Sequence, residues 1–408
     1  MTASEKSIYM DYHATTPLDP QVLEAMMPYL TNNFGNASST MHTFGWDAKE
    51  AVEQAREQVA DLINASPEEI VFTSGATESD NLAIKGVAYQ DRQKGNHIIT
   101  STTEHHAVLD TCNALEGEGF EVTYLDVDGY GMVHPQAVEA AITDRTILIS
   151  LIYANNEVGT VNPISEIGEI ADKHDILFHS DAVQGIGKIE SDVDILKVDL
   201  MSLTAHKMYG PKGIGALYIR NRLPKIQLHP MIHGGGQENQ VRPGTLNVPG
   251  IVGFGAACAI SKAVMVEEAQ RLIALRTRLY RQLSEQLDFL HLNSHPEKRL
   301  PGNLNISFEF VESESLLMGL EGIALSAGAA CTSNAIEVSH VLHAMGIKEE
   351  IALSAIRFGL GRYTTEAEVD LVVDAVVKQV QRLREISPLY EMAQAKNLPD
   401  GNVRVSKF

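Results

Sequence analysis

The sequence predicts an α/β protein with two domains, a large one built on a mainly parallel sheet flanked by helices and a smaller α+β domain. Three observations lead to this prediction. The chain has 408 residues, which is more than one domain of ordinary size. Short apolar segments alternate with helical patterns over most of the chain, as in strand–helix–strand units. A long helical pattern then begins near residue 257 and leads out of the first domain.

The predicted strands of the large domain are continuous apolar runs rather than alternating ones. Such runs suit strands that are covered on both faces, which is typical of a parallel sheet. The segments between them carry helical patterns, such as HHAVLDTCNAL after the second strand. In chain order, the predicted strands are 69–73, 97–101, 146–154, 176–182, 198–204 and 215–220.

The C-terminal part of the chain predicts the smaller domain. The long helical pattern runs through residues 262–287, and LNISFEF at 304–310 is typical of a strand. Apolar residues then recur at helical spacing, which predicts an amphipathic helix that covers the sheet of that strand. These residues are Val369, Val372, Val376, Val380 and Leu383.

Composition excludes several classes of function. The net charge is −21, which opposes binding to nucleic acid and to anionic membranes. The N-terminus has no apolar core of a signal peptide, and no apolar run approaches the ~18 residues of a membrane helix. The three cysteines form no CxxC pair and no disulfide framework. We therefore expect a cytoplasmic protein in which Cys112 and Cys258, on helical stretches, belong to the core.

One lysine and one aspartate stand at the ends of neighbouring predicted strands. Lys207, in TAHKMYGPKG, follows a strand and precedes a turn rich in glycine and proline. Asp181 lies near the end of ILFHSDA, 26 residues earlier. Because ligands of open α/β sheets bind beyond the carboxyl ends of the strands, we expect both side chains in one crevice.

Pyridoxal phosphate is the cofactor that needs this pair. A lysine amine forms its Schiff base, and a carboxylate partners its pyridinium nitrogen. The cofactor also needs an anion site, and Ser74-Gly75-Ala76-Thr77 supplies one where a strand ends and a helix opens. Each signal is weak alone, but the three occur in order on three strand ends.

Ten segments of the sequence resemble one family along nearly the whole chain. They are MDYHATTP, FTSGATESDNLAIKG, TEHHAVLDTC, NNEVGT, DAVQ, HKMYGPKGIGALY, HGGGQE, RPGT, SAGAACTS and IRFGLGRYTTE. Together they resemble the cysteine desulfurases of the IscS/NifS type, which are fold-type I enzymes of the class-V aminotransferase family. The resemblance implies a homodimer that uses pyridoxal phosphate and converts L-cysteine to L-alanine plus an enzyme persulfide.

The resemblance also implies a division into domains and a set of site residues. Residues 17–262 match the large cofactor-binding domain, and residues 1–16 and 263–408 match the small one. Lys207 matches the Schiff-base lysine, Asp181 the partner of the ring nitrogen, and Gln184 the donor to the ring hydroxyl. The cofactor contacts it implies are Lys207, Ala76, Thr77, His105, Asn156, Asp181, Gln184, Thr204, His206 and Thr245.

Some of these roles rest on the resemblance alone. His105 matches the ring-stacking histidine and acid/base group, whereas the residues themselves do not distinguish it from His106. Thr245 matches a phosphate contact donated by the second subunit. Asn156 and Arg357 match the substrate contacts, and a guanidinium suits the substrate carboxylate. His13 stands where the family pattern commonly has serine.

Cys331 lies in SAGAACTSN, a segment of small residues at 326–334. From this segment alone, a reactive thiol on a mobile loop and a small apolar residue in a turn are both open. The resemblance matches Cys331 to the nucleophile that takes the sulfur, on a mobile loop at about 326–340. It implies delivery of the sulfur to an iron–sulfur scaffold protein and other acceptors. No intrinsic metal is expected, although Cys331 has the chemistry to ligate a cluster transiently with a scaffold.

Three other interpretations use the same residues. A selenocysteine lyase has the same fold and chemistry. A class-V aminotransferase uses Lys207 and Asp181 but has no use for Cys331. A non-catalytic assembly subunit keeps the fold for partner binding alone and needs none of the site residues.

Overall fold

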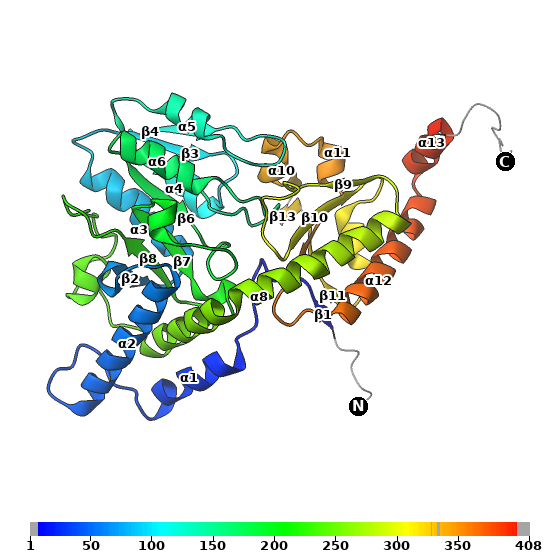
Figure 1. Cartoon of the computed structure of the whole chain (residues 1–408). Helices are drawn as coiled ribbons and strands as arrows, with labels where there is room; N and C mark the ends of the chain where they lie inside the picture. The colour runs from blue at the N-terminus through cyan, green and yellow to red at the C-terminus, as the bar shows by residue number, and fades with distance from the viewer. Residues whose placement is uncertain (1–6, 328, 333–334, 398–408) are drawn as a thin grey trace.

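The protein is an α/β structure with two bodies joined by one long helix (Figure 1). The computed structural model describes residues 7–327, 329–332 and 335–397. The larger body holds a seven-stranded sheet, and the smaller one holds a four-stranded sheet covered by helices. The predicted fold class is confirmed, with a mainly parallel central sheet flanked by helices.

The large sheet has the strand order β2-β8-β7-β6-β5-β3-β4. Five neighbouring strands pair in parallel, and β8 pairs antiparallel with both β7 and β2. The carboxyl ends of β3, β5, β6 and β7 therefore lie at one edge of the sheet. The strands are β2 (Ile70–Thr73), β3 (His97–Ser101), β4 (Glu121–Leu125), β5 (Thr146–Ser150), β6 (Leu177–Asp181), β7 (Leu200–Thr204) and β8 (Gly215–Ile219).

Helices cover both faces of this sheet, which explains its apolar strands. One core contains side chains of α2 (Thr43–Leu62), α6 (Ile164–Lys173) and the start of α8 (Val248–Gln286). The core on the other face contains side chains of α3 (Ala76–Gln90) and α4 (His106–Glu116). Cys112 and Cys258 are buried free thiols in these two cores, as predicted. The remaining helices of this body are α1 (Pro20–Thr31), α5 (Pro135–Ala141) and α7 (Val193–Leu196), with the 3₁₀ turns Pro67–Glu69, Ala205–Lys207 and Gln237–Gln240.

The helix α8 belongs to both bodies (Figure 1). Its residues up to Cys258 pack in the core of the large sheet, and its residues from Leu272 onward pack in the core of the small domain. It has the length and apolar composition of a membrane span, but 50% of its most apolar window is buried inside the protein. The domain boundary proposed at residues 262 and 263 falls between the two buried parts of this helix.

The small domain contains the four-stranded sheet β12-β15-β10-β9, which is antiparallel throughout. The predicted amphipathic helix is α12 (Glu366–Glu385), and its valines pack in the core of this domain. The short strand β1 (Ile8–Tyr9) pairs with β11 (Ile323–Ala324). The other elements are β9 (Leu290–Leu292), β10 (Asn303–Phe308), α9 (Ser313–Met318), β12 (Ser326–Ala327), α10 (His340–Ala344), α11 (Glu349–Ala352), β15 (Ala355–Gly359) and α13 (Pro388–Asn397).

Three sequence-based expectations differ from the structure. The third predicted strand was wrong beyond Ser150, where the regular ladder of β5 ends, although Leu151 N and Tyr153 N still donate to His179 O and Asp181 O of β6. β4 was not predicted, because an edge strand with partly exposed side chains lacks a continuous apolar run. The segment 326–340 is not one loop. Among its described residues, β13 (Ala329–Thr332) pairs antiparallel with β14 (Ala335–Val338).

Candidate active site

A cavity of about 650 Å³ lies at the carboxyl ends of the parallel strands. The segments at the ends of β3, β5, β6 and β7 contribute side chains to its wall, as expected for an open α/β sheet. The N-terminal segment around His13 and strand β15 of the small domain close the opposite side. The predicted site residues that line it are Ala76, Thr77, His105, Asn156, Asp181, Gln184, Thr204, His206, Lys207 and Arg357.

Lys207 lies in the 3₁₀ turn that follows β7, and its amine is held against the N-terminal segment. Its Nζ donates to the carbonyl oxygens of His13 and Ala14, at 2.6 Å each. Burial and, to a smaller extent, the nearby Arg357 guanidinium lower the pKa of Lys207 to about 8. An amine with this pKa is partly neutral near pH 8, so it can act as a nucleophile or base.

Asp181 is the last residue of β6, the strand beside β7, and it is buried. Its Oδ1 accepts a hydrogen bond from the backbone N–H of Val183 at 3.0 Å. Burial raises the pKa of Asp181 above its ordinary value, and His105 and Lys207 partly offset this effect. A cation placed in the cavity beside Asp181 would stabilise its charged form.

His105 is the N-cap of α4, and its ring Nδ1 accepts from the backbone N–H of Ala107 at 3.1 Å. Since this nitrogen accepts, the proton of the neutral ring is on Nε2. Burial lowers the pKa of His105, which favours this neutral form. The adjacent His106 does not line the cavity; it lies 3.7 Å from Asp110 on the exposed face of the same helix.

The start of α3 offers an anion cradle. The N-cap Gly75 has φ 156°, and a Cβ at this position would meet no atom within 4 Å, because it would point into open space. The next residues, Ala76 and Thr77, begin the helix, so their backbone N–H groups have no intrahelical partner. These features fit a phosphate at this end of the cavity.

Two further lining residues stand at the same end of the cavity. Thr204 is the last residue of β7, and His206 follows it. The ring Nδ1 of His206 lies 3.1 Å from the hydroxyl of Thr15. Burial lowers the pKa of His206 to about 4, so the ring is neutral at physiological pH.

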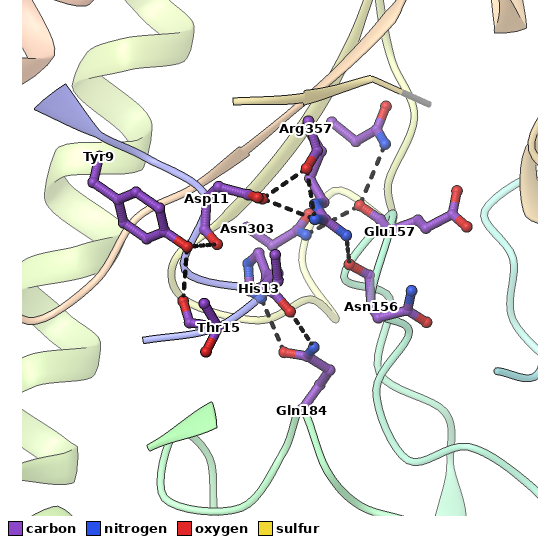
Figure 2. A network of polar contacts seen from close by, with 12 residues as sticks. Tyr9, Asp11, His13, Thr15, Asn156, Glu157, Gln184, Asn303 and Arg357 are labelled. Atoms are coloured by element: carbon purple, nitrogen blue, oxygen red, sulfur yellow. Dashed lines mark hydrogen bonds and ion pairs between the residues drawn. The ribbon is translucent and has the colours of Figure 1, made fainter. Parts of the chain in front are cut away.

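Arg357 lies in β15 of the small domain and joins three segments (Figure 2). Its Nη1 donates to the carbonyl oxygen of Asn156 at 2.9 Å. Its Nη2 donates to Asp11 Oδ1 at 2.8 Å and to Ser326 Oγ at 3.0 Å. The Nε–H group of Arg357 is a buried donor without a hydrogen-bond partner among the described residues.

Two predicted site residues are not among the described residues that line the cavity. Thr245 is exposed. Its segment is attached to the start of α3 by an ion pair, in which Arg242 Nε lies 2.7 Å from Glu78 Oε1. The backbone of Cys331 lies in β13, opposite Ile336 of β14, and its side chain is outside the described part of the structure. The segment that bears Cys331 follows Ser326, whose hydroxyl contacts Arg357 and Asp11.

Comparisons with known proteins identify the family of this chain. The profile of the class-V aminotransferase family matches residues 8–372. Cysteine desulfurase IscS of Anaeromyxobacter sp. (strain Fw109-5) is 57% identical over 387 residues, covering 95% of this chain and 96% of that protein. Its counterpart from Pseudomonas aeruginosa (strain UCBPP-PA14) is 55% identical over 94% of this chain and 95% of that protein.

The chain belongs to the cysteine desulfurases of the class-V aminotransferase family. Solved structures of this family have the same fold. A NifS-like protein has a TM-score of 0.86 at 39% identity, covering 92% of this chain and 100% of that chain. A structure of SspA in complex with cysteine has a TM-score of 0.78 at 41% identity, covering 88% of this chain and 100% of that chain.

Cysteine desulfurases of this family use pyridoxal phosphate, and the cavity fits this cofactor. Lys207 supplies the amine, Asp181 a buried carboxylate, and the turn at Gly75 an open cradle for an anion. Asp80 supports the fit, since it lines the cavity and both of its carboxylate oxygens are buried without a hydrogen-bond partner among the described residues. Its Oδ1 lies 3.7 Å from His179 Nε2.

Two buried carboxyl groups of the desulfurase site were missed by sequence reasoning. Burial raises the pKa of Asp80 well above its ordinary value, and the Asp181 charge raises it further. Burial also raises the pKa of Glu104 to about 8, although Glu104 accepts from Ser101 and from the N–H of Ile152. Asp80 and Glu104 lie inside polar runs, TESD and TTEHH, in which nothing in the sequence indicates burial. No signal short of the folded structure would have selected them.

Proposed function

We propose that this protein is a pyridoxal-phosphate-dependent cysteine desulfurase that converts L-cysteine to L-alanine and holds the sulfur as a persulfide on Cys331. One observation carries the proposal. A single cavity gathers the Lys207 amine, the Asp181 carboxylate and the Arg357 guanidinium from three strands. The amine suits attachment of the cofactor, the carboxylate suits the cofactor ring nitrogen, and the guanidinium suits the carboxylate of an amino-acid substrate.

The chain's own residues divide the work at the substrate α-carbon. Pyridoxal phosphate, when bound, supplies the electron sink that stabilises negative charge on that carbon. Asp181 holds a proton at the ring nitrogen through its buried carboxylate. Lys207 removes the α-proton, a role that its lowered pKa favours because the free amine is the base.

Arg357 and Asn156 orient the substrate. The free Nε of Arg357 and its Nη2 present a fork that suits the substrate carboxylate. When the carboxylate binds, it shares Nη2 with Asp11 or displaces it. Asn156 lies in the cavity wall and is tied to the same guanidinium through its backbone oxygen.

Cys331 takes the sulfur in the last step. Its thiolate attacks the substrate sulfur, so that an S–S bond forms while the bond between the sulfur and the substrate β-carbon breaks. The electron pair stays on that carbon, which takes up a proton and becomes the methyl group of alanine. His105 supplies a proton from Nε2, which the cap of α4 leaves protonated. Lys207 returns the α-proton to the substrate α-carbon, so that the products are alanine and one persulfide on the enzyme.

The test is a paired assay of the purified protein with L-cysteine and a thiol reductant. We expect alanine and sulfide in equal amounts, and loss of both in the Cys331→Ser variant, with the visible absorbance of the bound cofactor retained. Alanine or pyruvate without sulfide that depends on Cys331 would overturn the desulfurase assignment in favour of a lyase or an aminotransferase. A cofactor-free, colourless protein would support a non-catalytic subunit instead.

We also propose a cytoplasmic homodimer that passes sulfur to an iron–sulfur scaffold protein and to other acceptors. Large exposed apolar side chains between residues 23 and 46 support a second copy on this face. They are Leu23, Met27, Leu30, Phe34, Met41, Phe44 and Trp46. Light scattering of the purified protein is expected to give twice the 44.5 kDa chain mass. A monomer would contradict the dimer and the proposed role of Thr245.

A further inference from the structure

Gln184 is held between an imidazole and a second lysine. Figure 2 shows its two contacts with His13. It lies in the run of turns after β6, four residues before Lys188. Its Oε1 is 2.9 Å from Lys188 Nζ and 3.0 Å from His13 Nδ1. Its Nε2 donates to the backbone oxygen of His13 at 2.9 Å. The carbonyl group of His13 also accepts from Lys207.

These partners permit only one orientation of the Gln184 carboxamide. Burial lowers the pKa of Lys188 to about 7, and the charged amine below that pH only donates hydrogen bonds, so the atom that faces it is the carbonyl oxygen. A backbone carbonyl only accepts, so the atom that faces His13 O is the nitrogen. The reversed amide would set its NH₂ group against the Lys188 ammonium and its oxygen against the His13 oxygen. Both contacts would then be repulsive.

The same logic fixes the tautomer of His13. Because Gln184 Oε1 can only accept, His13 Nδ1 carries the proton. Burial lowers the pKa of His13 well below its ordinary value, so the ring is neutral and its buried Nε2 has no partner among the described residues.

We propose that Lys188 and His13 are positioning residues that lock the Gln184 carboxamide with its nitrogen toward the ring oxygen of the cofactor. An amide nitrogen carries two hydrogens, and His13 O takes one of them. The other remains for a ligand in the cavity that Gln184 lines. The inference rests on the proposed function, which assigns Gln184 to the ring hydroxyl.

The lock has a measurable consequence for the cofactor. A donor at the ring oxygen stabilises negative charge there, and this charge grows when the bound cofactor loses its proton. The donor therefore lowers the pH at which the visible absorbance of the holoenzyme changes. Without Lys188, the amide loses one of the contacts that oppose its reversal. A reversed amide would present its oxygen to the ring oxygen of the cofactor.

The test is a pH titration of the visible absorbance of the holoenzyme. In Lys188→Met, which keeps the length of the side chain and loses the donor, we expect the midpoint to rise by about one pH unit, the scale of one hydrogen bond to a charged group. Loss of the Lys188 charge would shift the midpoint in the same direction. The substitution is therefore repeated on a Gln184→Ala background, where the lock predicts no further shift.

A matched pair of variants tests His13. His13→Asn places an amide N–H near the position of Nδ1 and should keep the wild-type midpoint. His13→Leu should raise the midpoint by several tenths of a pH unit, a part of the Lys188 effect. Thermal unfolding of each holoenzyme checks that the variants are folded.

Three results would overturn the inference. They are an unchanged midpoint in Lys188→Met, the same shift with and without Gln184, or equal shifts in His13→Asn and His13→Leu. These outcomes are distinct from failure of the proposed function, in which the wild-type protein would show no visible cofactor absorbance at all. If Lys188→Met does not fold, the His13 pair decides the question alone.

Discussion

The two walls of the cavity hold their functional side chains in different ways. On the wall of the large sheet, Asp181 and Lys207 follow neighbouring buried strands, and their positions are set by the sheet itself. On the opposite wall, Arg357 is held by contacts with Asp11, Ser326 and Asn156, which come from three separate segments. Backbone pairing fixes the functional groups of the first wall before any ligand binds. On the second wall, Arg357 already has hydrogen-bond partners, and a substrate has to share or replace them.

This difference assigns separate tasks to the two walls. A cofactor that stays bound suits groups whose geometry the sheet fixes, since no rearrangement is needed at each turnover. A substrate that enters and leaves suits a guanidinium whose partners can be exchanged. Substitutions on the sheet wall should therefore affect kcat and cofactor binding, and substitutions on the opposite wall should affect KM for L-cysteine.

The largest effect is expected for Lys207→Ala. Removal of the amine takes away both the attachment of the cofactor and the base for the α-proton, so kcat should fall by about 10³-fold or more. Alanine formation and visible absorbance measure the two losses. The exposed Lys197, which pairs with Glu169 on the surface, is a control whose Ala variant should keep its activity. Normal turnover in the Lys207→Ala variant would contradict the assignment of the catalytic amine to the wall of the large sheet.

Arg357→Lys should mainly raise KM for L-cysteine, by about 30-fold, because a lysine cannot make the two parallel bonds of a guanidinium. The visible absorbance of the bound cofactor should be unchanged. Arg278→Lys is the matched control, since Arg278 makes a similar pair with Asp370 far from the cavity. A fall in kcat with KM unchanged would mean that Arg357 acts in the chemical step rather than in binding.

On the wall of the large sheet, the buried Lys207 amine should also lower the free energy of unfolding of the cofactor-free protein. Burial lowers the pKa of Lys207 to about 8, so between pH 8 and its ordinary value the unfolded chain binds more protons and stability rises with pH. The penalty is complete below pH 8. Lys207→Met should therefore raise Tm near pH 7 by about 2 °C. This gain should shrink as the pH rises toward 10 in paired melting curves. A gain that widens with pH would contradict the burial of the amine.

The smallest effect is expected for Ser326→Ala. The Ser326 hydroxyl donates to Asp11 and accepts from Arg357, so its loss should loosen the guanidinium without removing its charge. A change in KM of about twofold to fivefold is expected, the scale of one hydrogen bond. Steady-state kinetics at fixed reductant measure it. An effect as large as that of Arg357→Lys would assign Ser326 a direct contact with the substrate.

The sheet wall was also the more predictable of the two from sequence. Lys207 and Asp181 were placed correctly in one cavity because the ends of parallel strands meet at one edge, whatever the details of packing. The partners of Arg357 were not predictable, since Asp11 is 346 residues away and no local pattern links them. The burial of Asp80 and Glu104 was not predicted, because a carboxyl group in a polar run is ordinarily solvated. The strands β13 and β14 around Cys331 were not predicted, because a segment of small residues has no alternation of apolar and polar side chains.

The shared helix α8 has a consequence for cutting the protein into parts. Its 39 residues span about 58 Å, and the two ends are buried in different cores. A fragment that stops at residue 262 keeps all the strands of the large sheet. It contains only the first part of α8, however, and lacks the core of the small domain against which the rest of the helix packs. Because one rod spans both cores, heat should melt them in a single cooperative step, and two separately expressed fragments should recover a native structure only when they are mixed.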